Sequence, residues 1–391
     1  MIKLSTSLIY LLITIAVFSC KEEPDENAQN LITVDDTYDV SLQSPANEFG
    51  ILTGFPINMD LKKYVLMGQT STYQGGASFA SICMKTDSEY LVVATGYSEY
   101  SDFANAELIN LDLNIDTRQM TEQKIFQKNL AKIQTGGASL LKLNKDTILS
   151  FFFGKESNYI IDIYIKKSTD NGLTWSNPEK INTIKNEYQH AAASRAILLS
   201  NGRILLPMAI GGTGTQNYVF CYYSDDKGET WTATKLFKMK NNELYEPCIE
   251  ELETGRLIMT LRNQSGKIIF AFSDDNGLTW IDFLKSNIDS PDAPSVIARV
   301  PGTEDLILIW NNNTRIKDYQ NRSPLSLAIS HDDGKTWDYL FDIENRPNIG
   351  AYYPTINFNS EKLLITYTQR NEGDSKANVV YTEILLSNVL N

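Results

Sequence analysis

Short apolar runs separated by polar turns recur along the chain, and each pair of runs predicts a β-hairpin. In the first pair, residues 77–84 and 90–95 flank the polar turn Thr86–Glu89. The same arrangement returns five times, and the six turns are marked by Ser88, Asp146, Gly202, Gly255, Glu304 and Glu361. These markers are 58, 56, 53, 49 and 57 residues apart. The chain is therefore expected to repeat one supersecondary unit of about 50 to 60 residues six times.

A second repeat, S-x-D-x-G-x-T-W, follows four of these hairpins, and we call each copy a box. The boxes occupy residues 168–175, 224–231, 273–280 and 330–337. The Asp can accept hydrogen bonds from nearby backbone N–H groups, the Gly tolerates a positive φ, and the Trp can pack against the strands. We therefore expect the boxes to hold turns, although a Trp or an Asp at a surface turn can also bind sugar.

Six units of four short strands each predict an all-β fold, a six-bladed β-propeller spanning residues 31–391. The first unit lacks an intact box, and Leu111–Asp116 is interpreted as its remnant. The alternating run Ala377–Leu385 is expected to pair with Leu31–Val40. That pairing would close the ring and remove exposed sheet edges.

The N-terminal residues 1–20 are typical of an export signal rather than of the fold. Lys3 precedes a mostly apolar stretch that is short for a membrane span. The stretch ends in Val17-Phe18-Ser19-Cys20, which resembles a bacterial lipoprotein signal with Cys20 as the lipidated residue; an ordinary signal peptide with a chance cysteine is the alternative. Residues 21–30 form a polar tether whose acidic start resembles the tag of surface lipoproteins. We expect an outer-membrane lipid anchor and a location in the cell envelope, surface-exposed or periplasmic.

Composition narrows the choice of partners. Twenty Tyr and 16 Phe favour strands, and the net charge of −13 argues against nucleic acid, so an anionic glycan would need locally placed arginines. The odd set Cys83, Cys221 and Cys248 has no metal-binding spacing and predicts buried thiols. We expect no cofactor, no metal-ligand cluster and a monomer, while the acidic composition leaves a bound Ca²⁺ open.

The boxes and the six hairpins together resemble the sialidase (neuraminidase) superfamily over nearly the whole chain after residue 30. Such boxes also occur in propellers that cleave other glycans or none. The resemblance implies a cell-surface exo-glycosidase that releases a terminal acidic sugar from a glycan substrate. It also implies a site at the mouth of the propeller, with three arginines on the carboxylate, a Tyr nucleophile beside a Glu, and an Asp acid/base.

The resemblance carries these roles onto particular residues. Tyr245-Glu246-Pro247 resembles the segment that holds the family's Glu, with Tyr245 as a substrate contact. Arg262 and Arg322 resemble the second and third arginines. Tyr353 resembles the nucleophile, with Tyr352 as the alternative by one register.

Asp102 is assigned as the acid/base mainly by its distance along the chain. The first hairpin departs from the family pattern, because Gln74–Ala80 stands where the family has Arg-Ile-Pro. Loss of one bidentate arginine would weaken carboxylate recognition by roughly a few kcal/mol.

The third hairpin offers a different chemistry. His190 is one of two histidines and is suited to general acid or base catalysis near neutral pH; Arg195 follows as a substrate contact. Gln74 and Gln134 would be neutral donors facing the same funnel. A same-fold enzyme acting on a uronic-acid-type glycan, a structurally bonded His190, and a non-catalytic glycan-binding propeller are the alternatives that remain.

Overall fold

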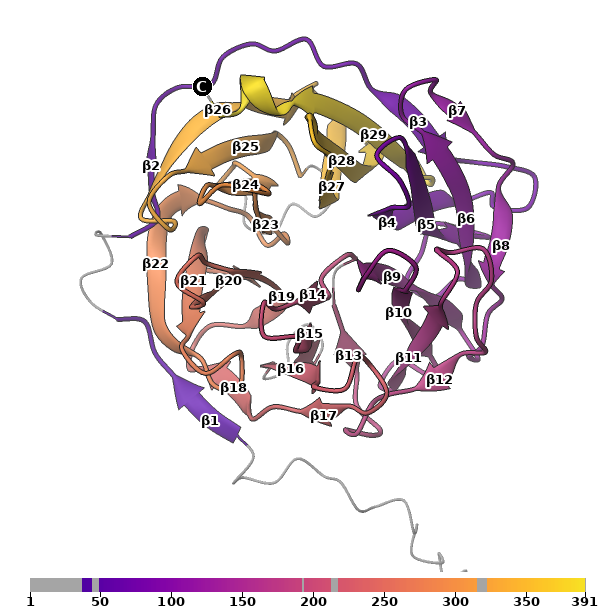
Figure 1. The fold of residues 1–391 in the computed structure, drawn as a ribbon, viewed down its shortest axis with the longest axis horizontal. Coiled ribbons are helices and arrows are strands. Elements are labelled where there is room, and N and C mark those ends of the chain that lie inside the picture. Colours follow the sequence, from indigo (N-terminus) through magenta and orange to yellow (C-terminus); the bar gives the residue numbers. More distant parts are fainter. Residues whose placement is uncertain (1–36, 44–48, 192, 212–216, 315–321, 391) are drawn as a thin grey trace, which may run out of the picture.

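The computed structural model describes residues 37–43, 49–191, 193–211, 217–314 and 322–390. Strands in this part of the chain form six sheets arranged around a ring, one for each predicted hairpin (Figure 1). The predicted all-β propeller is confirmed, and the one helical segment in the described ranges is the 3₁₀ helix η2 (Leu386–Asn388). No helix there is long and apolar enough to span a membrane. The proposed signal with Cys20 and the tether lie outside the described residues.

The first three sheets follow one another around the ring. Sheet 1 contains β4 (Gly76–Met84), β5 (Glu89–Tyr97), β6 (Ala106–Asn114), β7 (Gln119–Met120) and β8 (Lys124–Gln127). Sheet 2 contains β9 (Gln134–Lys142), β10 (Ile148–Lys155), β11 (Ile161–Ser168) and β12 (Glu179–Lys180). Sheet 3 contains β13 (Gln189–His190), β14 (Ile197–Leu198), β15 (Ile204–Ile210), β16 (Tyr218–Ser224), β17 (Thr232–Ala233) and β18 (Leu236–Met239), with β1 (Thr37–Val40) at its edge.

The other three sheets complete the ring. Sheet 4 contains β19 (Leu244–Glu251), β20 (Leu257–Asn263), β21 (Lys267–Ser273) and β22 (Ile281–Asp289). Sheet 5 contains β23 (Val296–Arg299), β24 (Leu306–Asn311), β25 (Leu325–Ser330) and β26 (Thr336–Glu344), with β2 (Ile51–Thr53) outside. Sheet 6 contains β27 (Ile349–Phe358), β28 (Lys362–Asn371) and β29 (Asn378–Leu385), with β3 (Tyr64–Met67) outside.

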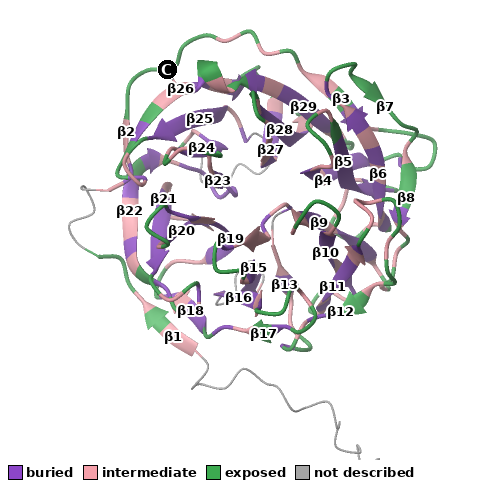
Figure 2. Ribbon diagram, in the orientation of Figure 1, coloured by how far each residue is buried: buried purple, intermediate pink, exposed green. Residues whose placement is uncertain are grey.

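Each predicted hairpin supplies the inner strands of one sheet. Strands such as β5, β15 and β24 are almost entirely buried, because both faces of an inner strand pack against side chains of the adjacent sheets (Figure 2). Their near-continuous apolar sequences follow from that double burial, whereas the outer strands β7 and β12 are exposed. The three cysteines of the body are buried, as predicted.

The boxes hold the turns between the third and fourth strands. In the box 273–280, Ser273 Oγ donates a 2.8 Å hydrogen bond to Asp275 Oδ1, which also accepts a 2.9 Å bond from the Thr279 backbone N–H. Gly277 has a φ of 83° and donates its N–H to Ser273 Oγ. No box residue lines the cavity described below. The boxes are therefore scaffold.

Ring closure differs from the prediction. Strand β29 pairs with β3, with Val380 opposite Val65, and not with residues 31–40. Strand β1 instead runs parallel to β18, where the Tyr38 hydroxyl accepts a hydrogen bond from the Trp280 backbone N–H. We call β1, β2 and β3 the N-terminal belt, because they supply the outermost strands of sheets 3, 5 and 6 (Figure 1). The prediction was wrong because the chain first passes along half of the ring before its closing strand begins.

Candidate functional site

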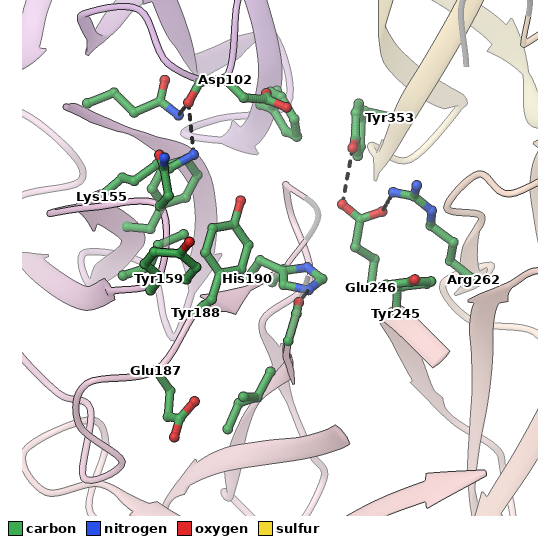
Figure 3. A pocket seen from close by; sticks show the side chains of 18 of the residues that line it. Asp102, Lys155, Tyr159, Glu187, Tyr188, His190, Tyr245, Glu246, Arg262 and Tyr353 are labelled. Atoms are coloured by element: carbon green, nitrogen blue, oxygen red, sulfur yellow. Dashed lines mark hydrogen bonds and ion pairs between the residues drawn. The ribbon is translucent and has the colours of Figure 1, made fainter. Parts of the chain in front are cut away.

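A cavity of about 1250 Å³ opens where the inner strands of the ring converge (Figure 3). Its lining includes Phe79 from sheet 1, Lys155 from sheet 2, His190 from sheet 3, Glu246 from sheet 4 and Tyr353 from sheet 6. Because the walls come from rigid strands and the loops next to them, distant parts of the sequence meet at this one place.

A row of four hydrogen-bonded groups crosses one wall of the cavity, and its two carboxylates, Glu246 and Asp292, are buried. The Tyr353 hydroxyl donates to Glu246 Oε1 at 3.1 Å. Arg262 Nη1 donates to Glu246 Oε2 at 2.6 Å, and Arg262 Nε donates to Asp292 Oδ1 at 2.5 Å. The structure thus brings together Tyr353, Glu246 and Arg262, three residues predicted from the sequence, and adds Asp292, which was not predicted.

Local backbone distortion aims these side chains at the cavity. Glu246 and Tyr353 have φ values of 32° and 54°, in the left-handed region that non-glycine residues seldom adopt. Each lies where the register of its strand shifts, between Tyr245 and Cys248 in β19 and between Tyr352 and Thr355 in β27. A bulge of this kind re-aims one side chain out of the normal alternation. The strain at Glu246 and Tyr353 is consistent with a functional role.

The electrostatics of the row keep the tyrosine protonated and the glutamate ionised. Burial raises the pKa of Tyr353 well above its ordinary value, and the charge of Glu246 raises it further. Burial would also raise the pKa of Glu246, but the charge and hydrogen bond of Arg262, together with His190 and Arg322, more than offset this effect and leave the pKa below its ordinary value. A neutral hydroxyl therefore donates its proton toward a ready carboxylate base.

Arginines form the adjoining wall. Arg322 is buried, and its Nη2 donates to the carbonyl oxygen of Asp292 at 2.9 Å. Its guanidinium carbon lies 5.6 Å from the centre of the Tyr352 ring and 5.7 Å from that of Tyr353. Arg370, from β28, lines the same cavity and was missed, because nothing near it in the sequence resembles a motif.

The first hairpin contributes no arginine to the cavity. Phe79, at a φ of 53° in β4, packs against Tyr353 with ring centres 4.1 Å apart and ring planes tilted by 36°. A third strand bulge, between Ser78 and Ser81, accounts for this direction of its side chain. The Phe79 ring thus lies in the part of the cavity where the family pattern would place the arginine of the first hairpin.

Asp102 lies across the cavity from Tyr353, in the connection between β5 and β6 (Figure 3). Asp102 is exposed, while its backbone carbonyl accepts hydrogen bonds from Lys155 Nζ at 2.9 Å and Gln134 Nε2 at 3.2 Å. Gln134 lines the cavity, as predicted, and its amide donates to this loop. The carboxyl remains open to water and to a ligand.

Lys155 was not predicted from the sequence. Its side chain is almost completely buried, and its ammonium lies 4.4 Å from the ring centre of Phe103 and 5.4 Å from that of Tyr188. Burial lowers the pKa of Lys155, an effect that the charge of Asp102 opposes. A buried cation next to the Asp102 loop suits a role in positioning that loop.

His190 lines the cavity beside Tyr245, with ring centres 6.1 Å apart. Its Nε2 lies 3.1 Å from the Gly211 carbonyl oxygen, and burial lowers its pKa, although Glu246 acts in the opposite direction. The ring is therefore neutral near pH 7, with Nε2–H donating to the carbonyl. Nδ1 is the ring nitrogen left to accept a hydrogen bond.

The structure does not bring Arg195 to this cavity. Ser194 has a φ of 56°, and the Arg195 backbone N–H donates to Ser139 Oγ at 2.9 Å. These features turn the side chain inward, where Nη2 donates to the Ser295 carbonyl oxygen at 3.0 Å. Arg195 lines a separate cavity of about 300 Å³ together with Cys248. The predicted pairing of His190 with Arg195 is therefore not formed.

Comparisons with known proteins agree with the fold. The sequence model of a family described as a BNR repeat-like domain matches residues 118–365. A sialidase of Bacteroides fragilis is 27% identical over 197 residues, which make up 47% of this chain and 35% of that protein. A sialidase of Paraclostridium sordellii is 25% identical over 54% of this chain and 59% of its own length. The chain thus spans only part of each relative.

The likeness extends to three-dimensional structure. Trypanosoma rangeli sialidase, solved in complex with sialic acid, superimposes with a TM-score of 0.63 at 18% identity. The superposition covers 78% of this chain and 54% of that one. At this identity the likeness concerns the fold, and the chemistry has to be argued from the cavity itself.

Proposed function

Because the chain belongs to the BNR repeat-like domain family, we propose that it is a sialidase-type exo-glycosidase that hydrolyses a terminal acidic sugar, such as a sialic acid, from a glycan. The observation that carries the proposal is the 3.1 Å hydrogen bond from the Tyr353 hydroxyl to Glu246. A nucleophile and a base in contact, inside a cavity large enough for a sugar, form the pair that covalent glycoside hydrolysis requires.

In the proposed first step, Tyr353 attacks the anomeric carbon as its phenolic proton passes to Glu246. A neutral nucleophile avoids repulsion from an anionic sugar, and Arg262 holds Glu246 ionised until the proton arrives. Asp102 protonates the departing glycosidic oxygen, so that the bond to the leaving group breaks as the bond to Tyr353 forms.

The second step releases the sugar. Asp102, now ionised, takes a proton from a water molecule that attacks the anomeric carbon, and Tyr353 leaves with the proton held by Glu246. Two displacements at one carbon retain its configuration. The exposure of Asp102 supports this role, because water can reach its carboxyl.

The test is hydrolysis of a fluorogenic sialoside by the protein and by matched tyrosine variants. We expect Tyr353→Phe and Glu246→Gln each to lower kcat by about 10² to 10⁴. Tyr381→Phe is the control, because its hydroxyl donates to Glu383 at 2.7 Å and its side chain does not line the cavity. No turnover by the unaltered protein at millimolar substrate, or an equal loss in both tyrosine variants, would sink the proposal.

A second substrate class is compatible with the same wall. His190 is neutral in the cavity, and its Nδ1 can accept a proton as a general base. An enzyme that uses His190 in this way on a uronic-acid-type glycan is the alternative. Turnover of an aryl glucuronide without turnover of the sialoside, together with its loss in His190→Ala, would favour that alternative.

We also propose that the protein is an outer-membrane lipoprotein anchored through Cys20, on the basis of the sequence before residue 21. Metabolic labelling with a radioactive fatty acid should mark the unaltered protein and not the Cys20→Ser variant. Equal labelling of the two would contradict the anchor.

A further inference from the structure

Arg370 is a cation in the cavity wall that no motif singled out. It belongs to β28, opposite Gly350 of β27, and so enters from the same sheet as Tyr352 and Tyr353. Its Nε donates to the Asp374 carbonyl oxygen at 2.6 Å, which fixes the guanidinium at the end of its strand. Among the described residues, Arg370 forms no ion pair with a carboxylate within 4.0 Å.

A pair of tyrosines connects Arg370 to Arg322. The guanidinium carbon of Arg370 lies 5.4 Å from the ring centre of Tyr100, and that of Arg322 lies 5.6 Å from the ring centre of Tyr352. The two tyrosine hydroxyls are 2.9 Å apart. Burial raises the pKa of Tyr352, and the hydrogen bond with Tyr100 and the charges of Arg322 and Arg370 all act in the opposite direction. Both arginines therefore act on the same hydroxyl pair.

The arginines that line the cavity in the described part of the chain differ in their surroundings. Arg262 lies between Glu246 and Asp292, so its charge is balanced by two buried carboxylates. Arg370 is held by a neutral carbonyl and adjoins neutral aromatic rings, so its charge has no such balance in the described structure. A partly desolvated guanidinium in this situation favours an anionic ligand, and its planar fork matches a carboxylate.

We propose that Arg370 and Arg322 form a carboxylate cradle, in which Arg370 from the last sheet supplies the charge that the first hairpin lacks. The inference rests on the proposed function in taking the ligand to be an acidic sugar. It adds that the carboxylate binds on the Tyr100–Tyr352 side of Tyr353, away from the sector that the Phe79 ring fills.

Binding can be measured without turnover by ligand-observed NMR titration of the full chain. The probes are N-acetylneuraminic acid and its methyl ester, in which a methyl group replaces the negative charge of the carboxylate. We expect the unaltered protein to bind the acid at least about tenfold more tightly than the ester. Arg370→Met should weaken binding of the acid by about 10- to 100-fold and leave binding of the ester within about twofold. Arg370→Lys should fall between, because it keeps the charge and loses the fork.

Arg299→Met is the matched control, since that arginine pairs with Glu253 and neither residue lines the cavity. The proposal is overturned if the unaltered protein does not distinguish acid from ester. It is also overturned if Arg370→Met binds the acid like the unaltered protein, or loses acid and ester equally. The two proposals fail separately. If the protein does not hydrolyse the sialoside but its preference for the acid depends on Arg370, the hydrolase proposal fails and the carboxylate cradle stands. If the protein hydrolyses the sialoside but its preference for the acid does not depend on Arg370, the cradle fails and the hydrolase proposal stands.

Discussion

Replacing Arg262 by methionine tests whether the row of buried charges is as tightly coupled as its geometry indicates. Arg262 bonds both Glu246 and Asp292, at 2.6 Å and 2.5 Å. The two carboxylate side chains are only 6% and 2% exposed, so water cannot take over from the guanidinium. Methionine fills much of the same length without charge, and the change therefore isolates the electrostatic contribution.

The expected magnitude follows from the burial. Removing one partner of a buried ion pair typically costs about 3 to 5 kcal/mol, because an uncompensated charge is left behind. Here two carboxylates lose the same partner, so we expect a loss of at least about 3 kcal/mol in the free energy of unfolding at pH 7. That is a large share of the roughly 5 to 15 kcal/mol by which folded domains are usually stable.

The loss should depend on pH in a defined direction. In the unaltered protein the pKa of Glu246 is depressed, so its stabilising contribution is present above the ordinary carboxyl value of 4.5 and is lost as the pH falls through the folded value. In Arg262→Met, the charges of His190 and Arg322 still oppose burial, but the largest opposing effect is gone. The folded pKa of Glu246 therefore rises, and the stability that its ionised form contributes at pH 7 is reduced. The difference between the two proteins should be largest at pH 7 and shrink toward pH 4.

Urea unfolding at pH 7, 6, 5 and 4 measures this difference, with Glu246→Gln/Arg262→Met as the matched variant. The second change removes one of the stranded charges, so the double variant should recover about 0.5 to 3 kcal/mol at pH 7. A loss below about 1 kcal/mol that is the same at every pH would refute the reasoning, because it would mean that the carboxylates do not depend on Arg262.

Two further predictions separate the site from its scaffold. Lys155→Met should lower kcat by about tenfold or more through a less ordered Asp102 loop, with little loss in the free energy of unfolding, because the change also removes a buried charge; an unchanged pH–rate profile and kcat would contradict this role. Asp275→Ala should lower the free energy of unfolding by about 1 to 3 kcal/mol, because the box loses its hydrogen bonds to Ser273 and Thr279. Its KM for the sialoside should stay the same, and a changed KM would assign the box a part in binding.

The sequence predicts the inner strands of the sheets well, because a strand buried on both faces has a recognisable, almost continuously apolar sequence. Strands such as β15 and β24 are buried on both faces and are therefore apolar throughout, while glycines and polar residues mark each turn. The closing strand β3 is four residues long and is too short to be recognised in this way. Its partner depends on where the ring ends, which is a property of the whole fold rather than of residues 64–67.

The site was predictable where function leaves a local motif. Glu246, Arg262 and Tyr353 stand in such contexts and meet in one cavity. The choice between Tyr352 and Tyr353 was not predictable, because a one-residue bulge decides which ring faces Glu246. Arg370 and Lys155 lie on ordinary strands, and only the closure of the ring brings them to the cavity wall.

The N-terminal belt has a consequence for how the ring comes apart. In an array of repeats each unit contacts only its neighbours, and units can open one at a time. Here the belt hydrogen-bonds to sheets 3, 5 and 6, and Phe49 packs edge-on against Phe270 and Phe272 of sheet 4 between them. Because the belt is one continuous segment, opening one of these sheets also pulls a belt strand, or the Phe49 ring, away from the other sheets that it contacts. Unfolding is therefore expected to be cooperative across this half of the ring, which limits partly open forms whose bare strand edges would aggregate.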